Sequence, residues 1–327
     1  MDIILEVHDL HVCYRKSTGT EIHAAQGISF DVRRGEILGC IGESGAGKST
    51  LAASLLSLLP TNGKILRGTI LLEGRNLLNM ASRELREVRG GRIGLIFQEP
   101  SLALHPTMRI GDQVTEVLRA HFPLENKQRR ERVAEALTAV FGSDAHRISS
   151  CYPHELSGGQ RQRAVIAQAI ACRPSVIVAD EPTASLDTVT QREILSLFQK
   201  LRGELGIAIV FITHNPALLA GFADRILVLY GGRVAELGST ADLLSSPLHP
   251  YTRMLLQCAP ALNDAIAQRQ GAKLPVIPGE PLDLSTCAPG CNFAARCPEK
   301  MEICGQRPPS RVQKGDAHEV SCFLYGG

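Results

Sequence analysis

The chain has 327 residues, 44% of them hydrophobic, which is enough for one large domain with a sizeable core and an appendage. Its 35 Lys and Arg residues nearly balance 33 Asp and Glu residues, and a net charge of +2 gives no electrostatic case for nucleic acid as a partner. The N-terminus lacks a basic start followed by an apolar stretch, and no apolar run approaches the roughly 18 residues that span a bilayer. We therefore expect a cytoplasmic protein.

Short β-prone runs between turn residues predict strands in the first hundred residues, at Ile4–Val7, Ile28–Val32, Ile37–Ile41 and Thr69–Leu72. Residues 107–172 favour helix, with apolar side chains at helical spacing at Val133, Ala136, Leu137 and Val140. Strand and helix then alternate, at Val176–Ala179, Gln191–Leu205, Ile207–Thr213 and Ile226–Leu229. This alternation indicates an α/β protein with a parallel sheet covered by helices.

A phosphate-binding loop follows the predicted strand Ile37–Ile41 and precedes the helix-prone stretch Leu51–Leu59. The strand–loop–helix order is the context that the P-loop pattern GxxxxGK[ST] requires. Its glycines let backbone N–H groups approach phosphate oxygens, its lysine charge can reach the β- and γ-phosphates, and its serine hydroxyl can ligate Mg²⁺. The residues of this loop are Gly42, Glu43, Ser44, Gly45, Ala46, Gly47, Lys48, Ser49 and Thr50.

An apolar strand that ends in two carboxylates complements this loop. Asp180 ends the run Val176–Ala179, where it can hold the Mg²⁺ shell, and Glu181 is placed to polarise an attacking water. A P-loop paired with such a strand predicts binding and hydrolysis of a nucleotide.

A second anion-binding helix terminus precedes that strand. Ser157 is a suitable N-cap for the helix-prone run Arg161 to Ala171, and Gly158, Gly159 and Gln160 leave backbone N–H groups exposed. The chain thus has two phosphate-binding elements.

With these motifs in this order, residues 3–240 resemble the ATP-binding cassette (ABC) ATPases. The resemblance implies a mixed-sheet core with a helical subdomain at about 99–172. It implies that Gln98 contacts Mg²⁺ and senses a transmembrane partner, and that Asp187 belongs to the loop Ser185-Leu186-Asp187. It also implies that His214 contacts the γ-phosphate and that Tyr14 stacks on adenine. Asn215 departs from the family, which usually has an acid after the histidine.

The resemblance further implies partners. In the family two ATPase domains meet head to tail, so Ser157 and Gly159 would serve the partner's nucleotide. The chain carries one motif set, and we expect a second, distinct ATPase chain, two permease subunits and an extracytoplasmic substrate-binding protein. The chain would then act peripherally at the cytoplasmic face of the cell membrane.

After about residue 247 the composition shifts to Pro, Gly and Cys. Cys291, Cys297, Cys304 and Cys322 have the spacing C-x5-C-x6-C-x17-C, while Cys287 is a spare or alternative ligand. Four thiolates can ligate zinc or an iron–sulfur cluster. Zinc sites favour tight C-x2–4-C pairs, which these four lack, so the spacing favours [4Fe-4S], with zinc or free thiols as alternatives.

This cysteine-rich region resembles the C-terminal extension of dipeptide and oligopeptide importer ATPases, a group that also includes nickel and metal-chelate importers. We therefore expect an ABC ATPase domain at 1–246, an extension at 247–327, and a peptide importer ATPase. The alternatives are a nickel or metal-chelate importer and an iron–sulfur redox sensor with a nucleotide domain. Repair ATPases need a longer insert than residues 100–170, and translation-associated relatives carry two cassettes in one chain.

Overall fold

The computed structural model describes residues 2–259, 262, 275–285, 289–315 and 317–326. The chain forms two compact units. The first contains the residues up to Ile4, Val32–Glu36 and Asn79–Phe211, and the second contains Leu5–Asp31, Ile37–Leu78 and the chain from Ile212 onward. Each unit is thus assembled from segments that are distant in the sequence.

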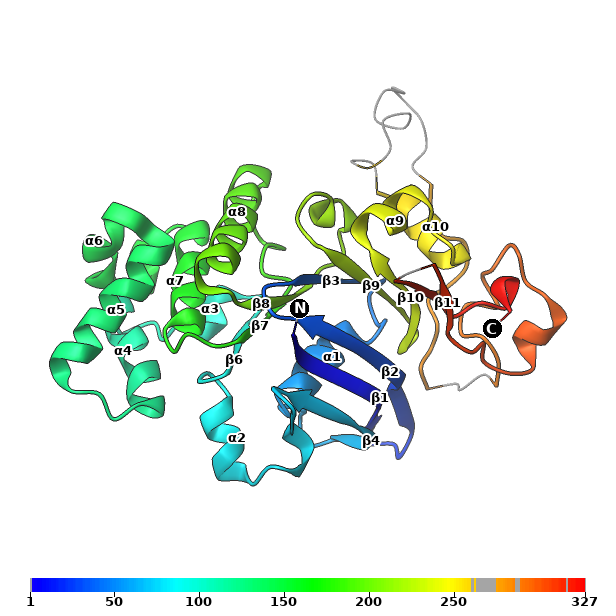
Figure 1. Cartoon of the computed structure of the whole chain (residues 1–327), viewed down its shortest axis with the longest axis horizontal. Coiled ribbons are helices and arrows are strands. Elements are labelled where there is room, and N and C mark those ends of the chain that lie inside the picture. The colour runs from blue at the N-terminus through cyan, green and yellow to red at the C-terminus, as the bar shows by residue number, and fades with distance from the viewer. Residues whose placement is uncertain (1, 260–261, 263–274, 286–288, 316, 327) are drawn as a thin grey trace. The chain divides into compact units, whose positions relative to one another are not determined.

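Helices dominate the first unit. They are α2 (Ser82–Val88), α3 (Pro100–Ala103), α4 (Ile110–His121), α5 (Asn126–Phe141), α6 (Ala145–Ser149), α7 (Gly158–Ile170) and α8 (Thr188–Leu205). α4, α6 and α7 all contact α5 (Figure 1), which buries Val133, Ala136, Leu137 and Val140 toward them. The helical spacing of these four residues is what turns one apolar face of α5 inward.

Three strands of the first unit lie side by side in the order β8 (Ala208–Ile212), β7 (Val176–Asp180) and β6 (Ile93–Ile96). β6 and β7 are parallel, with Ile93 opposite Val176. β8 is buried along its whole length, as a strand of a parallel sheet covered on both faces would be. The sequence predicted β7 and β8 to within a residue at each end.

The second unit contains a four-stranded antiparallel sheet in the order β2 (Glu21–Arg33), β1 (Ile3–Arg15), β4 (Gly63–Leu72) and β5 (Arg75–Asn76). Leu5 pairs with Leu72 and Tyr14 with Gly63 in the β1–β4 register. A bulge between His8 and His11 interrupts that register. β1, β2 and β4 extend well beyond the apolar runs that predicted them, because outside those runs polar residues interrupt the apolar ones.

A second set of strands in this unit has the order β11 (Val312–Lys314), β12 (His318–Val320), β10 (Arg233–Ser239), β9 (Arg225–Tyr230) and β3 (Ile37–Ile41). β3 and β9 are parallel, whereas β9 with β10, β10 with β12, and β12 with β11 are antiparallel. The Pro-, Gly- and Cys-rich composition of the tail is typical of loops, but β11 and β12 extend the sheet beyond β10. The sheet is therefore mixed.

Among its described residues, the second unit forms the α-helices α1 (Lys48–Leu55), α9 (Thr240–Ser245) and α10 (Pro250–Gln257). α1 ends before the expected Leu59, because Ser57 adopts a left-handed backbone with φ +50° and Pro60 follows. Within the part of the chain that the structure describes, no helix is long and apolar enough to cross a membrane.

Candidate functional site

The loop between β3 and α1 is held tightly by its glycines. A Cβ atom on Gly42 would lie 2.3 Å from the carbonyl oxygen of Leu229 in β9. Gly47 has φ +101°, and a Cβ there would lie 2.4 Å from the carbonyl oxygen of Ala24. No L side chain fits either place, so the loop passes close to neighbouring backbone in a conformation that only glycine adopts readily.

Lys48 begins α1 and folds back over this loop. Its buried Nζ donates hydrogen bonds to the carbonyl oxygens of Gly42 at 2.8 Å and of Glu43 at 3.0 Å. Ser44, Gly45 and Ser49 are exposed, Thr50 is half-buried and Ala46 is buried. The exposed loop and the positive end of α1 can together accept an anion, because the first N–H groups of a helix have no intrahelical acceptor.

Tyr14 lies against the same helix. Its hydroxyl donates a hydrogen bond to Thr50 Oγ1 at 3.3 Å. Its ring is close to Gly63, where a Cβ would come within 2.6 Å of a ring carbon. The structure thus brings Tyr14 and the P-loop together.

His214 follows β8 and is exposed. Its neighbour Thr213 donates its backbone N–H to the carbonyl oxygen of Cys40 in β3 at 3.0 Å. Asn215, which departs from the family, accepts the backbone N–H of Ala217 at 3.1 Å and caps a short helical turn. The backbone that precedes His214 is therefore bonded to β3, the strand that leads into the P-loop.

In the first unit, Glu181 and Gln98 meet. Gln98 Nε2 donates to Glu181 Oε2 at 3.4 Å. Asp180 is the last residue of β7, and Glu181 has φ +48°, a left-handed backbone that is uncommon for residues other than glycine. Strained backbone of this kind is concentrated at functional sites. The predicted carboxylates thus stand at the end of a buried strand beside the predicted glutamine.

The second anion-binding terminus has the expected cap. Ser157 Oγ accepts the backbone N–H of Gln160 at 3.3 Å, and Gln160 Oε1 accepts the backbone N–H of Ser157 at 3.0 Å. This reciprocal pair is a capping box. Ser157 and Gly158 are exposed at the start of α7. A Cβ on Gly159 would come within 2.6 Å of the side chain of Thr190, so this turn packs closely on α8.

Asp187 acts as the N-cap of α8. It accepts hydrogen bonds from the backbone N–H groups of Val189 and Thr190 at 3.0 Å and from the Thr190 hydroxyl at 2.7 Å. These bonds, first that of the Thr190 N–H, lower the pKa of Asp187. In this chain the Asp187 carboxylate therefore caps the N-terminus of α8.

Four cysteines of the tail line one small cavity. Burial raises the pKa of Cys322 to about 11, and proximity to the other three thiols raises it further. Burial also raises the pKa of Cys291 and of Cys297. Among the described residues, no three of these sulfurs lie within 4.8 Å of one another. Cys287 lies outside the described residues.

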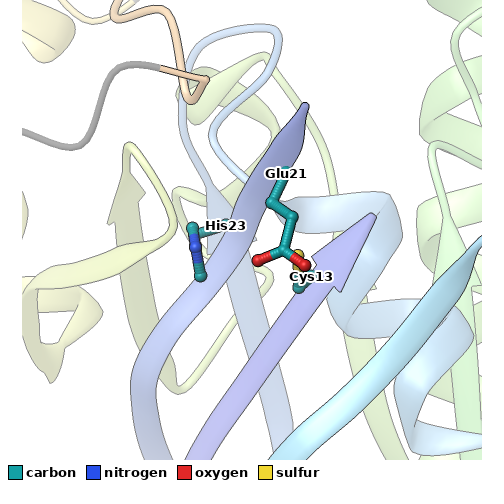
Figure 2. A group of neighbouring side chains, drawn as sticks. All are labelled: Cys13, Glu21 and His23. Atoms are coloured by element: carbon teal, nitrogen blue, oxygen red, sulfur yellow. The ribbon is translucent and has the colours of Figure 1, made fainter. Parts of the chain in front are cut away.

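Another group of metal-ligating atoms lies at the hairpin of β1 and β2. A sulfur, a carboxylate oxygen and an imidazole nitrogen, from Cys13, Glu21 and His23, all lie within 4.8 Å of one another (Figure 2). The donor set suits a zinc-type ion. However, Glu21 is exposed and already pairs with Arg15 at 3.1 Å. A metal ion would have to compete with that pair.

Sequence reasoning missed Arg296 and Tyr251. The Arg296 guanidinium contacts both carboxylate oxygens of Glu43, and Tyr251 accepts the backbone N–H of Glu43 at 2.8 Å. No spacing pattern in the sequence points to either residue, although Arg296 directly precedes Cys297.

Comparison with known proteins shows the class. Residues 25–184 match the ABC transporter family. The chain is similar to the solved dimer of the ATP-binding cassette MJ0796 bound to ADP and Pi, with 29% identity, a TM-score of 0.64, and coverage of 72% of this chain and 99% of that one. It is also similar to cbiO1 of Clostridium perfringens, part of an ABC transporter complex, with 30% identity, a TM-score of 0.66, and coverage of 75% and 92%. The fold is that of an ABC ATPase cassette, and the class is the ATP-hydrolysing ABC transporter subunits.

More specific similarity extends beyond the cassette. Residues 235–304 match the C-terminal region of oligopeptide/dipeptide transporters. The chain is 40% identical to the dipeptide transport ATP-binding protein DppD of Bacillus subtilis over 99% of this chain and 95% of that protein. It is 42% identical to the oligopeptide transport ATP-binding protein OppD of Salmonella typhimurium over 94% and 90%. The chain belongs to the oligopeptide/dipeptide transporter family of ABC ATP-binding proteins.

Proposed function

We propose that this chain is the ATP-hydrolysing subunit of a membrane importer for dipeptides or oligopeptides. The observation that carries the proposal is similarity over nearly the whole chain, cassette and C-terminal region together, to proteins named for peptide transport. A nickel or metal-chelate importer and a redox sensor are disfavoured, because the relatives reported above are named for peptide transport.

In the second unit, the proposed ATP site consists of the P-loop, Tyr14 of β1 and His214, which follows β8. The P-loop from Gly42 to Thr50 binds the phosphates through its backbone N–H groups and Lys48. Tyr14, whose hydroxyl is tied to Thr50, presents its ring to adenine. His214 contacts the γ-phosphate.

Catalysis in this proposal depends on residues at the end of β7. Mg²⁺, when bound, neutralises phosphate charge, and Ser49, Gln98 and Asp180 would hold it. Glu181 orients and polarises the attacking water, and its contact with Gln98 at 3.4 Å supports a shared role. Ser157, Gly158, Gly159 and Gln160 of this chain face the nucleotide of the partner ATPase, with Asp187 beside them.

The proposal implies an assembly. The chain divides into an ATPase domain at 1–246, with a helical subdomain at about 99–172, and an extension at 247–327. Two permease subunits, a second and distinct ATPase chain and an external binding protein complete the importer. The chain sits peripherally on the cytoplasmic face of the membrane, and closure of the two cassettes on ATP drives the permease.

We also propose that the tail cysteines hold a [4Fe-4S] cluster. Cys291, Cys297, Cys304 and Cys322 line one cavity, which suits a shared ligand. The sequence spacing of these cysteines, which lacks the tight C-x2–4-C pairs of structural zinc sites, favours a cluster over zinc. The cluster would fix the fold of the tail.

The test of transport is affinity purification of this chain from membranes, with its partners and the ligand of the copurified binding protein identified by mass spectrometry. We expect two permeases, a second ATPase and bound peptides. Recovery of a binding protein loaded with nickel or a metal chelate would replace the peptide assignment. Recovery of no permease would overturn the transporter assignment.

A further inference from the structure

Arg296 of the C-terminal region reaches the P-loop with an unusually complete set of hydrogen bonds. Its Nη1 donates to Glu43 Oε2 at 2.6 Å and its Nη2 to Glu43 Oε1 at 3.0 Å, which makes a bidentate ion pair. Nε donates to the carbonyl oxygen of Pro278 at 2.8 Å. The second N–H of Nη1 donates to the Tyr230 hydroxyl at 3.2 Å, and the second N–H of Nη2 donates to the carbonyl oxygen of Ile277 at 3.3 Å. All five guanidinium N–H donors are thus satisfied.

This ion pair is held out of water. The Arg296 side chain is 5% exposed and that of Glu43 is 23% exposed. The Tyr230 ring lies 5.9 Å from the guanidinium carbon, the Tyr251 hydroxyl contacts the Glu43 backbone, and both rings pack with each other and with Phe293 at centroid distances of 4.6 to 5.4 Å. A pair shielded in this way is far less screened than a surface salt bridge, and loss of one partner leaves an uncompensated charge.

Glu43 is in turn fixed at every polar group. Its N–H donates to the Tyr251 hydroxyl, and its carbonyl oxygen accepts from Lys48 Nζ at 3.0 Å and from the Ala46 N–H at 3.1 Å. Lys48 is the residue whose charge is expected at the phosphates. Glu43 therefore links Arg296 to the Lys48 ammonium group: its carboxylate contacts the arginine and its carbonyl oxygen accepts from the lysine.

A carboxylate in a phosphate-binding loop also raises an electrostatic problem. Unpaired, Glu43 would repel the nucleotide phosphates through a partly water-excluded site, where charges interact more strongly than in water. The bidentate contact with Arg296 neutralises that charge. The contact thus both orients the loop and removes the repulsion.

We propose that Arg296 is a positioning residue for the ATP site: through Glu43 it holds the P-loop ready for phosphate, so that nucleotide affinity depends on the C-terminal region. The inference rests on the proposed P-loop site. Arg296 lies between Cys291 and Cys297, and the Cys291 N–H donates to the Cys304 carbonyl oxygen at 2.8 Å. The segment that carries the arginine is thus part of the cysteine-lined fold.

The test measures the Kd of Mg-ATP for the full-length chain by titration calorimetry. Arg296→Gln should raise Kd about tenfold, which equals about 1.4 kcal/mol. Arg296→Lys should raise it less, because lysine keeps the charge but not the two-pronged contact. Adding Glu43→Gln to Arg296→Gln should recover part of the loss, since the unpaired carboxylate is then gone. Lost packing alone would not be repaired by that second change.

Two controls separate the possible failures. Arg253→Gln removes the ion pair with Glu299 in the same region, 2.9 Å long, and should leave Kd unchanged. Lys48→Ala should abolish binding; if it does not, the proposed site itself is wrong. If Lys48→Ala abolishes binding while Arg296→Gln binds like the unmodified chain, only the role of Arg296 fails. If Arg296→Gln does not fold, the Kd of Mg-ATP is compared for Arg296→Lys and for the double variant. An unchanged Kd in both would overturn the inference.

Discussion

At the scale of single residues, the carboxylate Glu181 combines an uncommon backbone with a specific neighbour. Its φ of +48° points it away from the regular path of β7, and Gln98 contacts it from a separate segment of the same unit. A side chain held this way is pre-positioned, which is what proton abstraction from water requires.

Replacing Glu181 by Gln should abolish hydrolysis and preserve ATP binding. The amide oxygen of glutamine can still accept from Gln98, so the geometry is kept while the base is lost. We expect turnover in the assembled complex to fall by at least about a hundredfold. Phosphate release and equilibrium binding of ATP provide the two measurements.

The matched control is Glu135→Gln, which removes a surface ion pair with Arg173 in the same unit. It should leave turnover within about twofold of the unmodified chain, because exposed pairs contribute little. Undiminished turnover of Glu181→Gln would show that another group is the base.

At the scale of secondary-structure elements, α10 depends on a buried histidine. His249 Nδ1 accepts the backbone N–H of Tyr251 at 3.0 Å and so caps the helix. The backbone N–H of His249 donates to Oε2 of the buried carboxylate of Glu236 at 2.9 Å, and the imidazole ring packs against Phe293. Burial, with a smaller contribution from the charge of Arg253, lowers the pKa of His249 to about 3.

Because this pKa lies below the ordinary value of 6.5, the folded chain resists protonation of His249 while the unfolded chain accepts it. The stabilisation is complete above pH 6.5 and is lost as the pH falls toward 3. The free energy of unfolding should therefore fall by about 1.4 kcal/mol per pH unit for this one group. His249→Asn keeps a capping acceptor and should flatten the dependence, at the cost of some stability at pH 7.

Urea denaturation at pH 7.5, 6.0 and 5.0 measures this effect. His8→Asn is the control, since the His8 side chain is 57% exposed and should not alter the slope. Equal slopes for His249→Asn and the unmodified chain would show that His249 does not account for the acid sensitivity.

At the scale of the whole molecule, the C-terminal region is built into the second unit. Its strand β12 pairs with β10, and its Arg296 contacts the loop after β3. The region therefore contributes to the unit that carries the P-loop as well as to the cysteine cavity.

Anaerobically purified chain should contain about four iron and four sulfide ions, as a [4Fe-4S] cluster requires. Cys297→Ser should lower the iron content and the visible absorption of the cluster. Cys258→Ser, which changes a half-buried cysteine that does not line the cavity, should retain both. Stoichiometric zinc with no sulfide would contradict the cluster.

The sequence by itself determined the P-loop, the strand and helix that flank it, and the cap of α7. The apolar run Ile37–Ile41 forms β3, the loop after it begins α1 at Lys48, and Ser157 caps α7 as expected. These features were predictable because capping, left-handed glycine and buried strands depend on near neighbours in the chain.

Only the tertiary structure decided which distant residues meet. Arg296 and Glu43 are 253 positions apart, and neither belongs to a pattern that predicts their contact. The addition of β11 and β12 to the sheet depends equally on packing between distant segments. The P-loop can therefore be recognised from the sequence alone, because its residues are neighbours in the chain. The contact of Arg296 with that loop appears only in the fold, because burial and ion pairing depend on distances in space.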